Sequence, residues 1–146
     1  MPLVLSASPA DAPALQRALA ANAFLVVGLC AAWCNTCTEF RDGFDELASA
    51  RSDATFVWLD IEDDADLAGD IDVENFPTIA IFKDGGLLHF GTSLPQQAIV
   101  ARLLSSLSDG ARTISAEPAV TALPERLAQT AARGVSSASP SNADTN

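Results

Sequence analysis

The feature that most limits the fold of this chain is the run "AFLVVGLCA" at residues 23–31, which is followed almost at once by a helical pattern. An apolar run of this length is typical of a β-strand that is covered on both faces. From Cys34 to Arg51 the pattern changes, and apolar residues recur every three or four positions, at Cys37, Phe40, Phe44 and Leu47. This period predicts an amphipathic helix with Cys37 on its core face. We therefore expect a buried strand that leads into a helix, with two cysteines at the junction.

The remaining elements up to Gly110 follow from the same kind of pattern. Helices are expected after Ser8, around Leu67 and Ile71, and over residues 93–110, and further strands over residues 3–5, 55–61, 78–82 and 87–90. The last two strands flank Lys83-Asp84-Gly85-Gly86, which favours a hairpin turn. The resulting order, β-α-β-α-β-α-β-β-α, predicts a three-layer α/β fold. Its centre is a mixed sheet of four to five strands flanked by helices.

The composition changes after Gly110. Ala, Ser and Thr make up half of residues 111–146, and Pro118, Pro124 and Pro140 are spread among them. A segment of this composition buries too little apolar surface to order itself. We therefore predict a domain over residues 1–110 and a flexible tail over residues 111–146.

Charge and hydropathy exclude several classes of partner. Eight basic and 19 acidic residues give a net charge of −11, which repels the phosphate backbone of nucleic acids. No apolar stretch approaches the roughly 20 residues of a membrane span, and the N-terminus lacks the basic and apolar regions of a secretory signal. We expect a cytoplasmic monomer with no membrane or nucleic-acid partner.

Cys34 and Cys37 have the spacing C-x-x-C at the start of the predicted helix. The unpaired N–H groups and the dipole at a helix N-terminus favour a thiolate at Cys34, whereas Cys37 lies one turn later and faces the core. An exposed attacking sulfur beside a sheltered second sulfur suits thiol–disulfide exchange. A metal site is the alternative, but zinc usually takes four ligands, and only Cys30 and His89 remain as thiol or imidazole partners. We expect no metal, and Cys30 is interpreted first as a small buried hydrophobic residue, with an alternative disulfide left open.

From about Leu3 to Leu107 the sequence resembles the thioredoxin family. The resemblance is carried by the apolar strand, "WCNTC" at 33–37, "FPT" at 76–78, "FKDGG" at 82–86 and Gly91. It implies that Cys34 attacks a substrate disulfide and Cys37 resolves the mixed disulfide. It also implies a cis peptide bond before Pro77, and a substrate groove formed by Trp33, Phe76, Pro77 and Gly91. No cofactor is implied, because the electrons reside on the sulfur atoms.

The sequence departs from the family pattern at three places. Asn35 and Thr36 stand between the cysteines, where typical members have Gly-Pro. Gly28 aligns with a buried Asp behind the inner cysteine, and Trp58 aligns with a nearby Lys. Because both proton-handling groups are missing, we expect an oxidoreductase that is slower, or poised differently, than a general thioredoxin.

The leading hypothesis is a protein-disulfide oxidoreductase that acts on protein disulfides or dithiols and is regenerated by a reductase or dithiol protein. Two other interpretations stay open: a redox-inactive or weakly active binding module or assembly factor for a protein client, and a metal carrier that uses all three cysteines. The acidic run over residues 60–74 lacks the spacing of a calcium loop and is interpreted as a solvated face. His89 and Trp58 are interpreted as structural residues.

Overall fold

The computed structural model of this chain describes residues 4–31, 34–51, 54–68, 71, 76–92, 97–107, 113–114 and 116–138. Its strands are β1 (Val4–Leu5), β2 (Phe24–Cys30), β3 (Ala54–Asp60), β4 (Thr78–Lys83) and β5 (Gly86–Thr92). Its helices are η1 (Pro9–Asp11), α1 (Ala12–Ala21), α2 (Asn35–Ala50), α3 (Ala65–Ala68), α4 (Gln97–Leu107), α5 (Pro118–Thr121) and α6 (Leu123–Ala138). None of the helices in this described part combines the length and apolar character needed to cross a membrane.

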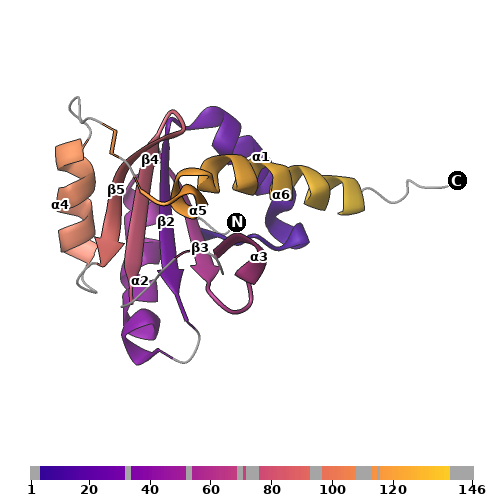
Figure 1. Cartoon of the computed structure of the whole chain (residues 1–146). Coiled ribbons are helices and arrows are strands. Elements are labelled where there is room, and N and C mark those ends of the chain that lie inside the picture. The colour runs from indigo at the N-terminus through magenta and orange to yellow at the C-terminus, as the bar shows by residue number, and fades with distance from the viewer. Residues whose placement is uncertain are drawn as a thin grey trace, which may run out of the picture.

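The five strands form one mixed sheet in the order β1-β3-β2-β4-β5 (Figure 1). β1 and β2 both pair with β3 in parallel, whereas β4 runs antiparallel to β2 and β5 antiparallel to β4. All seven residues of β2 are buried, as expected for the central strand of a sheet covered on both faces. The predicted α/β fold with a mixed sheet is confirmed.

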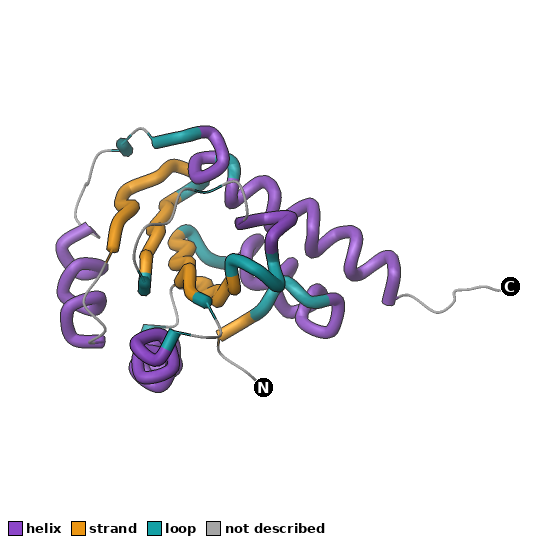
Figure 2. The backbone as a smooth tube through the Cα atoms, turned by 60° about the horizontal axis from the view of Figure 1, so that its bottom comes forward, coloured by secondary structure: helices purple, strands orange, loops and turns teal. Residues whose placement is uncertain are grey.

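Helices cover both faces of the sheet. α2 and α4 lie on one face, and α1, α3 and α6 lie on the other, so the sheet forms the middle layer (Figure 2). Phe40 and Phe44 of α2 and Leu104 of α4 are fully buried against the first face. Leu15 of α1 and Leu127 of α6 are fully buried against the second. Two apolar cores, one on each face, therefore stabilise the domain.

The hairpin turn lies where the sequence predicts it. Asp84 and Gly85 connect β4 to β5 and have φ angles of 51° and 86°. Positive φ at both central residues is characteristic of a tight hairpin turn, and Asp and Gly are among the residues that adopt it at least cost. The turn is tied to the sheet because the Asp84 N–H donates a hydrogen bond to the carbonyl oxygen of Ala23 at 2.9 Å.

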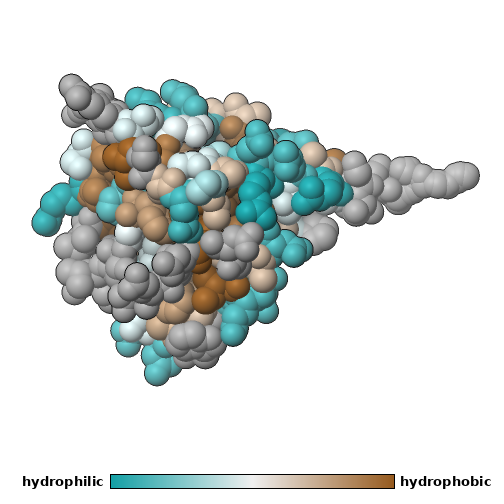
Figure 3. Space-filling model, in the orientation of Figure 1, coloured by the Kyte–Doolittle hydropathy of each residue, from teal (hydrophilic) through white to brown (hydrophobic). Residues whose placement is uncertain are grey.

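The C-terminal segment corrects the predicted flexible tail. Residues 118–138 form α5 and α6, and α6 lies along α1 and projects past the sheet (Figure 1). The apolar side chains of α6 are buried in the second core, at Leu123, Leu127 and Ala131. Val120 of the preceding α5 is buried there as well. The opposite side of α6 is hydrophilic (Figure 3). The prediction rested on the overall composition of the segment, which does not reveal that its apolar residues recur every four positions. The packed structure therefore extends beyond the expected boundary at residue 110.

Candidate functional site

The candidate site lies at one edge of the sheet, where β2 and β3 end and β4 begins. Leu29 pairs with Leu59 on one side and with Thr78 on the other, and Cys30 pairs with Asp60. The residue before Thr78 is Pro77, so this register brings the end of β2 close to the Phe76–Pro77 bond. That bond is cis, as the resemblance implied, and Pro77 is buried.

α2 begins at this edge and places two cysteines in different environments. Cys34 is the N-cap residue with extended backbone angles, and its N–H donates to the carbonyl oxygen of Ala31 at 3.0 Å. The Cys34 carbonyl then accepts the N–H of Thr38 at 3.2 Å and begins the helix. Cys34 is partly exposed, whereas Cys37 is only 2% exposed and lies on the same helix face as Phe40 and Phe44. The predicted contrast between an outer and an inner sulfur is therefore present in the burial of the two residues.

The disulfide joins Cys37 to Cys30, and Cys34 remains a free thiol. The Cα atoms of Cys30 and Cys37 are 5.9 Å apart, within the usual range for a disulfide. This differs from the expected pairing of Cys34 with Cys37, and it gives Cys30 a second role besides packing. The first expectation for Cys30 was right about its burial, because it is 1% exposed, but not about its bonding.

The position of Cys30 explains the pairing. Residues two apart in a strand share a face, so Val26, Gly28 and Cys30 all project toward α2. Val26 does belong to the core beneath α2. The sequence carried a signal for this pairing, because Cys30 lies two residues after Gly28, which was expected to lie behind the inner cysteine, and residues two apart in a strand share a face.

An aromatic cluster surrounds Trp58, one of the two positions at which the sequence was expected to depart from the family pattern. Gly28 and Trp58 are neighbours on adjacent strands, and a Cβ atom at residue 28 would lie 3.2 Å from Cε3 of Trp58. The Trp58 ring packs against Phe44 with ring centroids 5.4 Å apart, and the Arg41 guanidinium lies 5.1 Å from its centroid. The missing side chain at Gly28 thus makes room for the indole.

Carboxylates lie beside this cluster. A cavity of about 490 Å³ has Cys37, Trp58, Arg41, Asp60 and Asp64 among its lining residues. Asp60 accepts hydrogen bonds from the N–H groups of Glu62 at 2.8 Å and Asp63 at 3.0 Å, and Asp64 accepts the N–H of Asp60 at 2.8 Å. Burial raises the pKa of Asp64 above its ordinary value of 3.8.

The acidic run is thus only partly the solvated face that the sequence predicts. Asp60 and Asp64 are half-buried and shape the turn before α3, while Glu62, Asp63 and Asp66 are exposed. Asp70, Asp72 and Glu74 lie outside the described residues. Within the part of the chain that the structure describes, no three His, Cys, Asp or Glu side chains are grouped so as to hold a metal ion.

The other predicted groove residues divide into two groups. Phe76, Pro77 and Gly91 are described, and Gly91 pairs with Ile79 two residues past Pro77. Trp33 lies outside the described residues, so its predicted contribution to the groove stays a prediction.

His89 is half-buried in β5 on the same face as Gly91, and a Cβ atom at residue 91 would lie 3.9 Å from its ring. Burial lowers the pKa of His89 below its ordinary value of 6.5. Above pH 6.5 the imidazole is neutral in both folded and unfolded chains. As the pH falls below 6.5, the unfolded chain takes up the proton more readily, so folding stability is lost until the folded pKa is passed.

We therefore expect His89→Gln to reduce the loss of stability on acidification. The measurement is the free energy of unfolding in urea at about pH 8 and about pH 5, for the parent and the variant. Asp64 titrates in both proteins and cancels in the comparison. An equal loss of stability in the two proteins would show that His89 ionises as easily in the folded chain as in the unfolded one.

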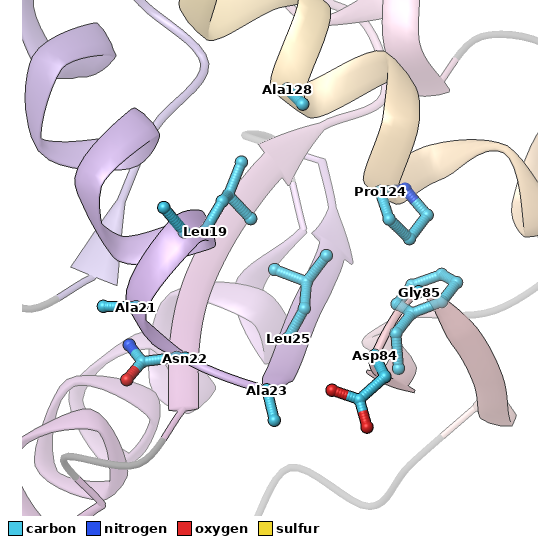
Figure 4. A pocket seen from close by; sticks show the side chains of 11 residues that line it. Leu19, Ala21, Asn22, Ala23, Leu25, Asp84, Gly85, Pro124 and Ala128 are labelled. Atoms are coloured by element: carbon cyan, nitrogen blue, oxygen red, sulfur yellow. The ribbon is translucent and has the colours of Figure 1, made fainter.

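A second cavity, of about 480 Å³, lies far from the cysteines. It is formed by the end of α1, the hairpin turn and the start of α6, with Leu19, Leu25, Asp84 and Pro124 directed toward it (Figure 4). Ala23 directly precedes β2 and Leu25 is near its start, whereas Cys30 is at its end. This cavity has no thiol among its lining residues and is separate from the candidate site.

Comparison with known proteins agrees with this geometry. The thioredoxin family model matches residues 9–105. The thioredoxin of Mycoplasmoides gallisepticum is 31% identical over 71 residues, which are 49% of this chain and 71% of that protein. Mouse thioredoxin is 35% identical over 74 residues, or 49% of this chain and 70% of the mouse protein.

Solved structures share the fold. A mutant thioredoxin from Halobacterium salinarum superposes with a TM-score of 0.60 at 20% identity, covering 76% of this chain and 96% of that one. Oxidized mitochondrial thioredoxin 3 from Saccharomyces cerevisiae gives a TM-score of 0.57 at 22% identity, covering 71% and 95%. With the family model matched over most of the packed structure, this chain belongs to the thioredoxin family.

Proposed function

We propose that this chain is a protein-disulfide oxidoreductase in which Cys34 is the attacking thiol and Cys37 the resolving thiol. Family membership and a cysteine pair that forms a disulfide support thiol–disulfide exchange as the general chemistry. The observation that carries the assignment of roles is the contrast in burial between Cys34, partly exposed at the start of α2, and Cys37, enclosed one turn later.

The reaction follows from these positions. The Cys34 thiolate attacks one sulfur of a substrate disulfide, and the other substrate sulfur leaves as a thiolate. The Cys37 thiolate then attacks the Cys34 sulfur, which releases the second substrate thiol and leaves a disulfide between Cys34 and Cys37. Two electrons have passed from the protein to the substrate, and a reductase or a dithiol protein returns them.

The substrate would bind across the sheet edge beside the cysteines. Phe76, Pro77 and Gly91 are the described residues assigned to this groove, and Trp33 is assigned to its rim by the family resemblance. Thioredoxin-family proteins act on disulfides of proteins, so the expected ligand is an extended protein segment that carries a disulfide.

The aromatic cluster behind Cys37 supports a slower exchange than in a general thioredoxin. Gly28 and Trp58 supply neither a carboxylate nor an ammonium group to move the proton of the inner thiol. Proton transfer then depends on water or on a carboxylate from the neighbouring cavity, where Asp60 and Asp64 lie. A rate of insulin reduction equal to that of a typical thioredoxin would contradict this part of the proposal.

Cys34→Ser is expected to lower the turnover of insulin disulfides by at least about a hundredfold, because the attacking sulfur is lost. Cys37→Ser is expected to accumulate mixed disulfides through Cys34, which mass spectrometry detects on a defined disulfide peptide. Asn35→Ala, an exposed change between the two cysteines, is the matched control for local disturbance. Turnover that survives in Cys34→Ser would contradict the assigned role.

The competing function is a binding module that uses the same fold without redox chemistry. The altered groups behind Cys37 favour it, because a module has no need to move a proton there. A Cys34→Ser/Cys37→Ser double variant separates the two functions. A module binds its client as tightly as the parent does, whereas an oxidoreductase loses the covalent complex.

A further inference from the structure

The Cys30–Cys37 disulfide is enclosed on the inner side of α2. Cys30 of the central strand β2 is 1% exposed, and Cys37 on the core face of α2 is 2% exposed. Cys37 lies at the wall of the cavity that it shares with Trp58 and Arg41. An attacking thiolate must reach a sulfur atom to reduce a disulfide, so access limits the rate. Dissolved thiols and protein substrates are therefore expected to reach this bond slowly while the chain is folded.

Cys34 is the one cysteine that is exposed to solvent and also close in the chain to the buried disulfide. It is partly exposed and carries a free thiol, and it precedes Cys37 by three residues at the start of α2. Residues three apart on a helix lie close enough for side-chain contact, and this spacing is the one that C-x-x-C disulfides use. Cys34 can thus react with a partner outside and with Cys37 inside.

We propose that Cys30 is a third redox-active cysteine, which holds Cys37 in a buried disulfide that is opened and closed only through Cys34. This inference rests on the proposed function, because it assigns the same attacking role to Cys34. In the opening step the Cys34 thiolate attacks the Cys37 sulfur, a Cys34–Cys37 bond forms, and Cys30 leaves as a thiolate that takes up a proton. No electrons are gained or lost in this exchange.

An external dithiol then completes the reduction. One of its thiolates attacks the exposed Cys34 sulfur and displaces Cys37 as a thiolate, and its second thiol closes a disulfide on the dithiol and frees Cys34. The two electrons come from the dithiol, and the protein finishes with three thiols. Run in reverse, oxidation by a substrate first gives the Cys34–Cys37 disulfide, and transfer of Cys37 to Cys30 then returns Cys34 as a free thiol.

The test follows the Cys30–Cys37 linkage under native conditions. Oxidised full-length parent and Cys34→Ser are treated with dithiothreitol, quenched with an alkylating agent, digested and mapped by mass spectrometry. The linkage is expected in the oxidised parent, and in Cys34→Ser it is formed by oxidation in denaturant before refolding, because burial does not restrict access in the unfolded chain. Its reduction under native conditions is then expected to be at least about tenfold slower in Cys34→Ser than in the parent. In denaturant that unfolds both chains, the parent and Cys34→Ser should lose the Cys30–Cys37 bond at similar rates, because burial no longer keeps dithiothreitol from the sulfur atoms.

Two results would overturn the inference. One is an oxidised parent whose only linkage is Cys34–Cys37. The other is a native Cys34→Ser chain that loses the Cys30–Cys37 bond as fast as the parent does. Far-UV and near-UV circular dichroism of Cys34→Ser establish that a fast rate does not come from a loosened fold.

A Cys30→Ala variant separates this inference from the proposed function. It retains Cys34 and Cys37, and its oxidised form is expected to carry the Cys34–Cys37 disulfide. If Cys30→Ala reduces insulin while the parent never forms the Cys30–Cys37 bond, the role of Cys30 fails and the oxidoreductase assignment stands. If neither Cys30→Ala nor the parent reduces insulin, the proposed function fails.

Discussion

Ending the chain after residue 112 is expected to lower the free energy of unfolding by about 5 kcal/mol or more. The truncation removes Val120, Leu123 and Leu127, which are fully buried in the core beneath α1, and burying each such side chain contributes about 1.5–3 kcal/mol. Single domains are stable by only about 5–15 kcal/mol, so the loss approaches the whole stability. Urea unfolding followed by circular dichroism measures it, and binding of a hydrophobic dye reports the uncovered face.

Point substitutions keep this prediction testable if the truncated chain does not fold. Leu127→Ala is expected to cost about 2–5 kcal/mol, because it leaves a cavity in the core. Gln129→Ala, an exposed change two residues later, is the matched control and should cost little. A truncated chain that is as stable as the full chain would restore the domain boundary at residue 110 that composition alone predicted.

Gly28→Asp is expected to be the most damaging single change near the cysteines, with a cost of about 3–5 kcal/mol. The new Cβ would lie 3.2 Å from Cε3 of Trp58 and 3.4 Å from Cζ of Phe44, and the carboxylate would enter an aromatic cluster. The neighbouring residue on β3 is Trp58, which offers no cation to the new carboxylate. A buried charge without a partner is the physical reason for the loss.

Gly28→Ala separates packing from charge in this experiment. It adds the same Cβ without the carboxylate, so Trp58 and Phe44 need to shift by only a few tenths of an ångström. Urea unfolding of the parent and both variants at neutral pH gives the comparison. Equal stability of Gly28→Asp and Gly28→Ala would mean that the acid finds a partner or water, and that the space behind Cys37 is more polar than its aromatic lining indicates.

Much of the fold follows from short-range patterns in the chain. The apolar run of β2, the period of α2 and the Asp84-Gly85 turn each depend on residues within a few positions of one another. Local backbone preferences and periodicity act over this range, so the strands and helices up to residue 107 were predictable. The contrast between an outer and an inner cysteine at the start of α2 was predictable in the same way, because their difference in burial follows from the helical period.

The bonding partner of Cys37 and the docking of the C-terminal helix depend on contacts between distant parts of the chain. In a strand that is apolar on both faces, the sequence shows no alternation, so the side on which Cys30 lies is fixed by its pairing with β3 and by α2 packed above it. α6 likewise gains its stability from α1 and the sheet, because an isolated helix of this length is marginal in water. Periodicity along the chain says which side of a helix is apolar, but the surface that receives it exists only once the domain has folded.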